Sequence, residues 1–300
     1  MKKLLFCLSV ALFAMGTMQT NAQNIIDAEE SHNDNFYAKT LSKGKEAMPY
    51  QHLRESDVVW QTTIWRRIDM NESFNQYLYF PIETEEEGNT QNRINIVNLL
   101  IKAAENGDFE IYEDDDMKVP TEWEKAKLNL AGAPYTVQVP VIGDDGQPLE
   151  DEDGETVMQD QQVVPEFDKA SAKKLNLKEF WFIDKQDTRQ KVRIVGLSFQ
   201  FERAAKGGGS NNVTSFWVPM NYMTVRQVLV NANAFEENNE VAERSYDDIF
   251  IQRYFESFIT RESNKYNRKI SDYLTGKDAI VESQMIEERI FDIENDMWEY

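Results

Sequence analysis

The chain has 300 residues, 41% hydrophobic and 12% aromatic, a composition that favours a globular protein with a sizeable core over a disordered one. Its formal net charge of −21 argues against nucleic acid and anionic lipid as partners, and it leaves basic protein surfaces or divalent cations. The one cysteine, Cys7, excludes a disulfide within the chain.

Residues 1–22 are predicted to be a secretory signal peptide. Lys2 and Lys3 are followed by an apolar stretch, Leu4 to Gly16, and by small residues at Thr20 to Ala22. The stretch is shorter than the about 20 apolar residues that span a bilayer. Cys7 precedes this stretch instead of ending it, which disfavours lipidation. We therefore expect an exported protein that is neither lipid-anchored nor inserted in a membrane.

Residues 23 to about 50 are polar, carry charges of both signs and have few clustered apolar residues. This pattern predicts an extended N-terminal arm. Such an arm is either a mobile terminus or a segment that orders on a neighbouring subunit, and the sequence does not choose between the two. Residues 51–300 are predicted to form a single α+β domain with a helical C-terminal part at 221–300.

The run from residue 54 to 81 predicts a helix followed by a strand. Ser56 or Asp57 suits an N-cap, and the residues after it are apolar at spacings of four, as on one face of a helix. These are Trp60, Ile64 and Ile68, widened by Val58 and Trp65 and flanked by Arg66 and Arg67. Residues 76–80 are expected to form a strand that ends at Pro81. Tryptophans on such a helix are more often core anchors than ligand contacts.

Two further helices are predicted before residue 131. The first covers residues 92–106, and Gly107 suits the position just beyond its end. The second opens at Thr121, which has capping-box spacing to Glu124, and runs to about Leu130.

Residues 135–165 are expected to alternate strand and turn. Seven acids and no bases lie between Asp144 and Glu155. The calcium-loop pattern fails, because Leu149 falls at its first ligand position when Gly154 takes the place of its glycine. An exposed acidic hairpin is favoured, and weak binding of divalent cations stays open.

The clearest strand signal lies in two segments: Lys178 to Lys185 carries the apolar run Phe180 to Ile183, and Lys191 to Arg203 alternates, with Gly196 a candidate bulge. The glycines at 207–209 join the second strand to residues 213–219. They lack the G-x-x-x-x-G-K-[ST] spacing of a phosphate loop and link two predicted strands, so a hairpin loop is favoured.

The last eighty residues are predicted to be helical. One helix covers residues 222–234, and Ser245 caps the next. Arg253, Arg261 and Arg268 recur at about two turns, so they could line one face of a continuing helix, which Asn264 or Asn267 could instead break. A terminal helix follows Gly276, over residues 278–300. The predicted fold class is therefore α+β: a small, mainly antiparallel sheet with flanking helices and a helical C-terminal portion.

No residues with a recognisable catalytic pattern stand out. The histidines are His32 and His52, and no zinc spacing, G-x-S-x-G elbow or G-x-G-x-x-G turn occurs. A serine or threonine nucleophile with a lysine base, or a carboxylate pair, stays open but has no specificity among 53 acids. We therefore predict no catalytic, cofactor-binding or metal residues, and a protein that is not an enzyme.

Several blocks of sequence carry a family resemblance. The first is R-x-S-D-V-V-W-x-x-x-I-W-R-x-I-D at residues 54–69, followed by L-Y-F-P at 78–81. The second is D-D-I-F-x-x-R-x-F-x-S-F-I-x-R-E-S-N at 247–264, with S-D-Y-x-x-G-x-D-A-x-x-E-S at 271–283 and D-x-W-E-Y at 296–300. Together with the strands from Phe180 to Phe201, these resemble the GldN/PorN proteins of the type IX secretion and gliding machinery of Bacteroidetes.

The resemblance implies a non-enzymatic periplasmic ring subunit. Such proteins associate with an outer-membrane lipoprotein of the GldK/PorK type, which would place this chain peripherally at the outer membrane. They also receive the periplasmic part of an inner-membrane protein of the GldM/PorM type. The partners implied are thus these two proteins and further copies of the chain itself, with no cofactor.

Two hypotheses follow, a ring-forming scaffold and a soluble periplasmic ligand-binding module or hydrolase whose carboxylate site the fold assembles. A ring of one subunit type needs two different surfaces that meet head to tail. Besides the arm, the candidate interface residues are Trp60, Trp65, Arg66, Arg67, Arg253, Arg261, Arg268, Trp298 and Tyr300. Packing within the chain is the competing interpretation of each. A deep pocket with perturbed carboxylates would favour the second hypothesis.

Overall fold

The computed structural model describes residues 45–82, 93–132, 135–140, 158–163, 167–204, 210–236 and 244–298. All of them belong to one compact unit of the chain, Lys45–Tyr300. The predicted signal peptide, residues 23–44 of the predicted arm, the acidic turns at 144–155 and the glycines at 207–209 lie outside the described residues.

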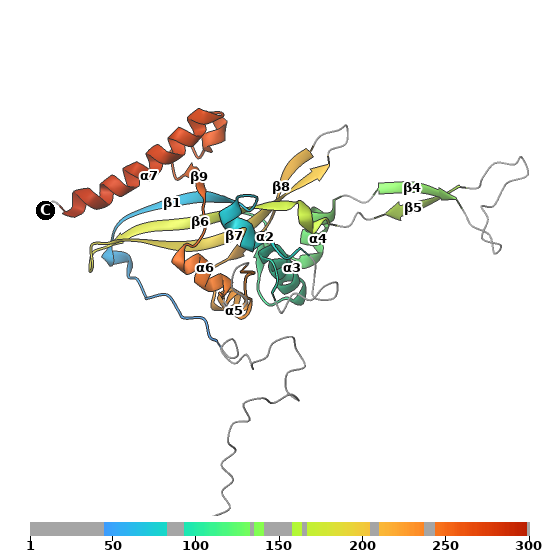
Figure 1. Cartoon of the computed structure of the whole chain (residues 1–300), viewed down its shortest axis with the longest axis horizontal. Helices are drawn as coiled ribbons and strands as arrows, with labels where there is room; N and C mark the ends of the chain where they lie inside the picture. The colour runs from blue at the N-terminus through green and yellow to red at the C-terminus, as the bar shows by residue number, and fades with distance from the viewer. Residues whose placement is uncertain are drawn as a thin grey trace, which may run out of the picture. The chain divides into compact units, whose positions relative to one another are not determined.

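A seven-stranded sheet organises this unit (Figure 1), and its strands lie in the order β3-β2-β8-β7-β6-β1-β9 with antiparallel pairing throughout. The strands are β1 (Val58–Asp69), β2 (Ile111–Tyr112), β3 (Pro120–Thr121), β6 (Ala172–Asp184), β7 (Gln190–Ala204), β8 (Ser210–Pro219) and β9 (Phe258–Glu262). A second, two-stranded sheet pairs β4 (Tyr135–Pro140) with β5 (Met158–Val163). The predicted antiparallel α+β class is confirmed.

The helices of the described residues fall into one group between β1 and β6 and one after β8. They are α2 (Gln76–Tyr79), α3 (Ile96–Asn106), α4 (Trp123–Ala131), α5 (Met223–Asn231), α6 (Tyr246–Gln252) and α7 (Lys277–Trp298). Short 3-10 turns occur at Glu55–Asp57, Ser73–Asn75, Lys169–Ser171 and Ile270–Asp272. The terminal helix, which follows Gly276 in the left-handed region (φ +62°), was correctly predicted.

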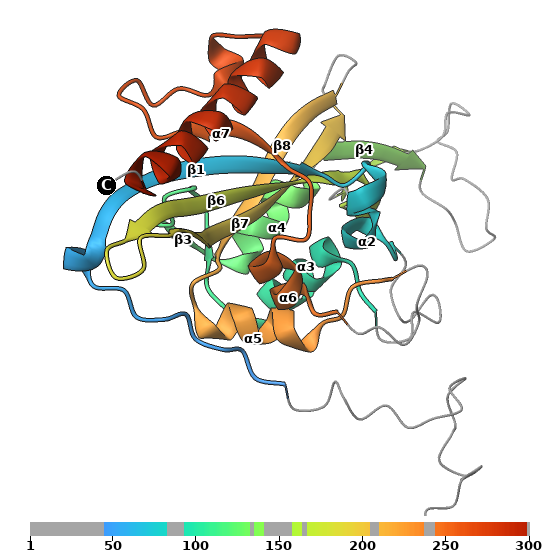
Figure 2. The same cartoon turned by 60° about the vertical axis from the view of Figure 1, so that its left-hand side comes forward.

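Two clusters of buried apolar side chains hold these elements on the sheet. The larger one packs α3, α4, α5 and α6 against β6, β7 and β8. The smaller one consists of Ile64, Ile259, Ile270, Ile286 and Ile290 and attaches α7 beside β1 and β9, apart from the other helices (Figure 2). Burying an isoleucine stabilises a fold by about 1.5–3 kcal/mol, so this cluster is the main anchor of α7.

The predicted helix at residues 56–68 is wrong, because these residues form the strand β1. Its apolar spacing of four is also a multiple of two, and a strand repeats every two residues. The run is rich in β-branched residues, which favour strands. The second half of β1 shows burial that repeats every two residues, because Ile64, Arg66 and Ile68 are buried and the residues between them are only half-buried.

The predicted strand at residues 76–80 is also wrong, since Gln76–Tyr79 is the short helix α2. Its tyrosines are fixed by tertiary contacts: the hydroxyl of Tyr77 donates to the carbonyl of Tyr254, and that of Tyr79 to Ala170 at 2.8 Å. The helix after Thr121 is confirmed as α4, but the capping box is not, because Thr121 belongs to β3 and Glu122 is the N-cap.

The continuing helix through Arg253, Arg261 and Arg268 does not exist. Ser245 caps α6 as predicted, but the helix ends at Arg253, which adopts the left-handed conformation (φ 54°). The chain then enters β9, so Arg261 lies on a strand and Arg268 in the loop beyond it. The C-terminal portion is therefore helical only in part.

Several local predictions are confirmed by the hydrogen bonds that they require. Gly107 ends α3 in the left-handed region, and its amide donates to the carbonyls of Ala103 and Ala104. The register of β6 against β7 shifts beside Gly196, as expected for a bulge.

Candidate functional site

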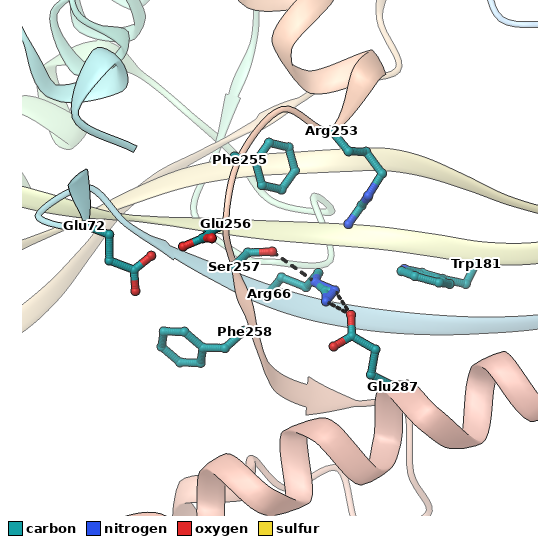
Figure 3. Close-up of a pocket in the computed structure, with 9 residues that line it drawn as sticks. All are labelled: Arg66, Glu72, Trp181, Arg253, Phe255, Glu256, Ser257, Phe258 and Glu287. Atoms are coloured by element: carbon teal, nitrogen blue, oxygen red, sulfur yellow. Dashed lines mark hydrogen bonds and ion pairs between the residues drawn. The ribbon is translucent and has the colours of Figure 1, made fainter. Parts of the chain in front are cut away.

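A groove of about 450 Å³ lies where β1, β6, α7 and the segment between α6 and β9 come together (Figure 3). Nine residues from these elements line it, namely Arg66, Glu72, Trp181, Arg253, Phe255, Glu256, Ser257, Phe258 and Glu287. Arg66 and Arg253 are two of the sequence-predicted interface residues, and the fold brings them together although 187 positions separate them in the chain.

Arg66 points into the groove because even-numbered residues of β1 face α7 and the helices. Its side chain is only 5% exposed, and its guanidinium lies 5.8 Å from the ring centroid of Trp181. Nε donates to Oγ of Ser257 at 3.2 Å, and both Nη atoms donate to Oε1 of Glu287. A buried guanidinium needs such partners to offset its lost hydration, so Arg66 is committed to internal contacts.

Arg253 enters the groove from the end of α6 and neutralises a carboxylate that is fully buried. Its Nη1 donates to Oε1 of Glu179 at 2.8 Å, and Nε1 of Trp181 donates to the other oxygen at 2.8 Å. Glu179 is 0% exposed, whereas the Arg253 side chain keeps 29%. Nε and Nη2 of Arg253 have no hydrogen-bond partner among the described residues. This arginine can therefore still receive a ligand.

The other end of the groove is acidic. Burial, with the charges of Asp69 and Glu256 adding to it, raises the pKa of the Glu72 carboxyl above its usual range. Asn75 holds this end together: its Nδ2 donates to Glu72 at 3.1 Å, and its Oδ1 accepts from the Glu256 amide at 3.0 Å. Figure 3 shows Glu72 and Glu256 away from the two arginines. The groove thus has paired charges at one end, Arg66 with Glu287 and Arg253 with Glu179, and an excess of carboxylates at the other.

Odd-numbered residues of β1 face the opposite side of the sheet and form a second cluster. The guanidinium of Arg261 lies 3.4 Å from the ring centroid of Trp65 and pairs with Asp115. Nζ of Lys178 lies 5.4 Å from the same ring and donates to Asp116 at 2.9 Å. This hydrogen bond holds the pKa of the Asp116 carboxyl below its usual range. The loop between β2 and β3 is thereby clasped onto the sheet.

The remaining candidates lie elsewhere. Arg67 donates from Nε to Asn176 at 3.1 Å, and burial, opposed by Asp69, lowers its pKa. Trp60 is half-buried against the isoleucine cluster under α7. The guanidinium of Arg268 lies 4.8 and 4.4 Å from the Tyr266 and Tyr273 rings, in a smaller groove of about 270 Å³.

At the C-terminus, Trp298 closes α7 but its side chain lies outside the described residues, as does Tyr300. Sequence analysis missed Glu179 and Glu287 as partners of the arginines. The sequence does contain a signal for Glu179, because Glu179 and Trp181 alternate on one face of a predicted strand. The pairing of Glu287 with Arg66 follows only from the position of α7 in the fold.

This arrangement is suited to recognition. The described residues contain no group of three or more His, Cys, Asp or Glu that could hold a metal ion. None of the helices among them is long and apolar enough to cross a membrane. The groove is lined by aromatic rings and arginines, which are enriched in protein interfaces, and by glutamates, which are not.

The comparisons with known proteins identify the family. Residues 53–299 match the model of the family described as gliding motility associated protein GldN. The chain belongs to the GldN family. It is therefore a component of the gliding motility and type IX secretion machinery, and this family is not a known enzyme family. No match is found among curated proteins. The residues of the groove and those of the cluster around Trp65 lie within the stretch that matches GldN.

Proposed function

We propose that this GldN-family protein is a non-enzymatic periplasmic scaffold. It forms a ring with an outer-membrane lipoprotein of the GldK/PorK type. It couples that ring to the periplasmic part of an inner-membrane motor protein of the GldM/PorM type. The family match over residues 53–299 is the observation that carries the proposal. Export by the signal at residues 1–22 and attachment to the outer membrane through the lipoprotein belong to the same proposal.

The groove supplies one of the two different surfaces that a ring contact needs. Phe258, which is 44% exposed, and the unsatisfied nitrogens of Arg253 are the groups that a neighbouring subunit or partner would contact. Arg66, Trp65 and Arg261 are positioning residues instead, because their guanidinium and indole groups already contact each other or internal carboxylates. Of the interface residues predicted from the sequence, Arg253 therefore remains as a direct contact to test, together with Phe258.

The test is the particle mass of the mature protein, alone and mixed with its candidate lipoprotein, measured by mass photometry without crosslinker. We expect a large uniform particle that requires the lipoprotein. Phe258→Ser should reduce its yield at an unchanged melting temperature, whereas the control Leu128→Ser, on α4 and 52% exposed, should not reduce it. Arg253→Gln should also reduce the yield, and its melting temperature is compared with that of the wild type because this change also leaves the buried Glu179 unpaired. A monomer that ignores the lipoprotein would refute the scaffold, and unchanged assembly of both groove variants would exclude the groove from the contact.

A shortened chain tests the predicted arm separately. Residues 45–50 contact α5, so the deletion should cover residues 23–44 only and leave this contact intact. Loss of the large particle with an unchanged melting temperature would assign the arm to the ring contact. Unchanged assembly would remove it.

The second hypothesis, a ligand-binding module or hydrolase, rests on the neighbouring Glu72 and Glu256 carboxyls and on the raised pKa of the former. Glu72 itself is exposed and the groove is open, which favours the scaffold over an enclosed carboxylate site. Stabilisation by a small ligand in a thermal-shift screen, lost in Glu72→Gln, would reverse this preference.

A further inference from the structure

The helix α7 leaves several large apolar side chains exposed to solvent. One face packs on β1 and β9 through the isoleucine cluster, and Oγ of Ser283 accepts a hydrogen bond from the Ile259 amide at 3.0 Å. On the remaining surface lie four large apolar side chains, Ile280, Val281, Met285 and Phe291, which are 62%, 50%, 57% and 61% exposed. Surface helices normally carry polar residues there, and apolar residues gathered on one element mark an interaction site.

This surface, the outer face of α7, is held in a fixed position. Besides the isoleucines, Glu287 binds Arg66, Arg289 pairs with Glu262, and the Gln190 amide donates to Glu294 at 3.4 Å. The contacts extend over much of the helix, from Ser283 to Glu294. A partner that docks on the outer face would therefore lose little free energy in ordering the helix.

Acidic residues lie among and beside these apolar side chains: Glu288 is three residues from both Met285 and Phe291, and Asp292 follows Phe291. Asp278, Glu288, Asp292 and Asp296 are exposed, and none of their side chains has a hydrogen bond or ion pair within the part of the chain that the structure describes. Of the two bases of α7, Lys277 stands at its first residue and Arg289 is paired with Glu262. The outer face is thus apolar at four positions, with acidic side chains interspersed among them.

We propose that the outer face of α7 is a docking surface for an amphipathic segment of another protein, apolar on one side and flanked by lysine or arginine. The apolar contact would supply affinity, and the basic flanks would set orientation and speed association. A second copy of this chain fits worse, because its net charge is −21 and an α7–α7 contact would bring like charges together. This surface is separate from the groove and does not depend on the proposed ring.

Fluorescence anisotropy with a labelled amphipathic peptide of leucine and lysine tests the proposal on the full mature chain. A peptide with the same leucine pattern and glutamate in place of lysine is the matched probe. Two doubly substituted variants remove the apolar surface, I280S/F291S and V281Q/M285Q, and a third, E288Q/D292N, removes charge. The control is L128S/Y222S, whose two side chains are similarly exposed on α4 and beside α5.

We expect the leucine–lysine peptide to bind, with about tenfold weaker binding for each apolar variant, since a central interface side chain typically contributes more than 1 kcal/mol. The charge variant should bind more weakly at low salt and show a smaller salt dependence. Equal binding of the glutamate peptide, or unchanged binding in both apolar variants, would overturn the proposal. So would sedimentation of the wild type as a dimer that the apolar variants dissociate, because the occupant would then be a second copy.

Discussion

The ion pair between Arg226 in α5 and Asp247 in α6 is the best enclosed of those that the described residues form, with side chains 1% and 7% exposed. Nε donates to Oδ1 at 2.9 Å and Nη2 to Oδ2 at 2.7 Å, the two-pronged geometry that arginine favours. The guanidinium also lies 4.4 Å from the Tyr50 ring centroid and donates to the Met48 carbonyl. It therefore ties residues before β1 to both helices.

Removing one member of this pair leaves the other as a buried, uncompensated charge. Such a loss typically costs about 3–5 kcal/mol, and for a domain of this size each kcal/mol lowers Tm by roughly 2–4 °C. Arg226→Met and Asp247→Leu should therefore each lower Tm by about 10 °C. The double variant replaces the pair by apolar groups of similar size and should recover most of that loss.

Thermal unfolding followed by circular dichroism measures all four proteins and gives the coupling free energy of the pair. Hydrogen exchange adds a local readout, because the Ala47 amide donates to the Gln227 side chain at 3.1 Å and should exchange faster in Arg226→Met. Single variants that cost less than about 1 kcal/mol, or a double variant that costs the sum of the two, would contradict the buried-charge argument.

Three further predictions concern the sheet, the helix α7 and the loop between β2 and β3. Asp116→Asn should lower Tm at neutral pH but not at acid pH. The hydrogen bond from Lys178 lowers the pKa of Asp116, so the ionised carboxylate stabilises the fold above the unfolded pKa of 3.8, and this stabilisation is lost as pH falls below that value. Thermal melts at a series of pH values check this. Ile290→Ala, at 2% exposure under α7, should cost about 2–5 kcal/mol by chemical denaturation. Gly196→Val should cost about 1–3 kcal/mol in the same assay, because a Cβ there would lie 3.2 Å from Cε of Met117.

The confirmed sequence predictions rest on local chemistry. Ser245 before α6, Gly107 after α3 and Gly276 before α7 each occupy the position that a cap or a left-handed residue requires. Hydrogen bonds of this kind form between residues close in the chain, so a short stretch of sequence contains all the information needed to place them. The strands β6 and β7 were found for a similar reason, since β6 contains the apolar run Phe180 to Ile183 and β7 alternates over much of its length.

The wrong predictions arose where an apolar spacing fits both a helix and a strand, or where the local structure involves a contact with a residue distant in the chain. Apolar residues four apart fit both a helix and a strand, and only the ladder of β1 against β6, from Val58 opposite Asp184 to Asp69 opposite Lys174, separates the two. Arg253, the residue that ends α6, pairs with the buried Glu179, which lies 74 positions earlier in the chain. No local pattern contains that contact.

The strand at β1 changes what its residues can do. On a helix, the consecutive residues Trp65, Arg66 and Arg67 would have pointed in directions about 100° apart. On a strand, Arg66 faces the groove beside α7, while Trp65 faces the clasped loop between β2 and β3. Both side chains therefore make contacts within the chain. The stretch that matches the family signature holds α7 on one side of the sheet and the loop between β2 and β3 on the other. We therefore propose that contacts with partners involve the exposed groups, Phe258 and Arg253 in the groove and the outer face of α7.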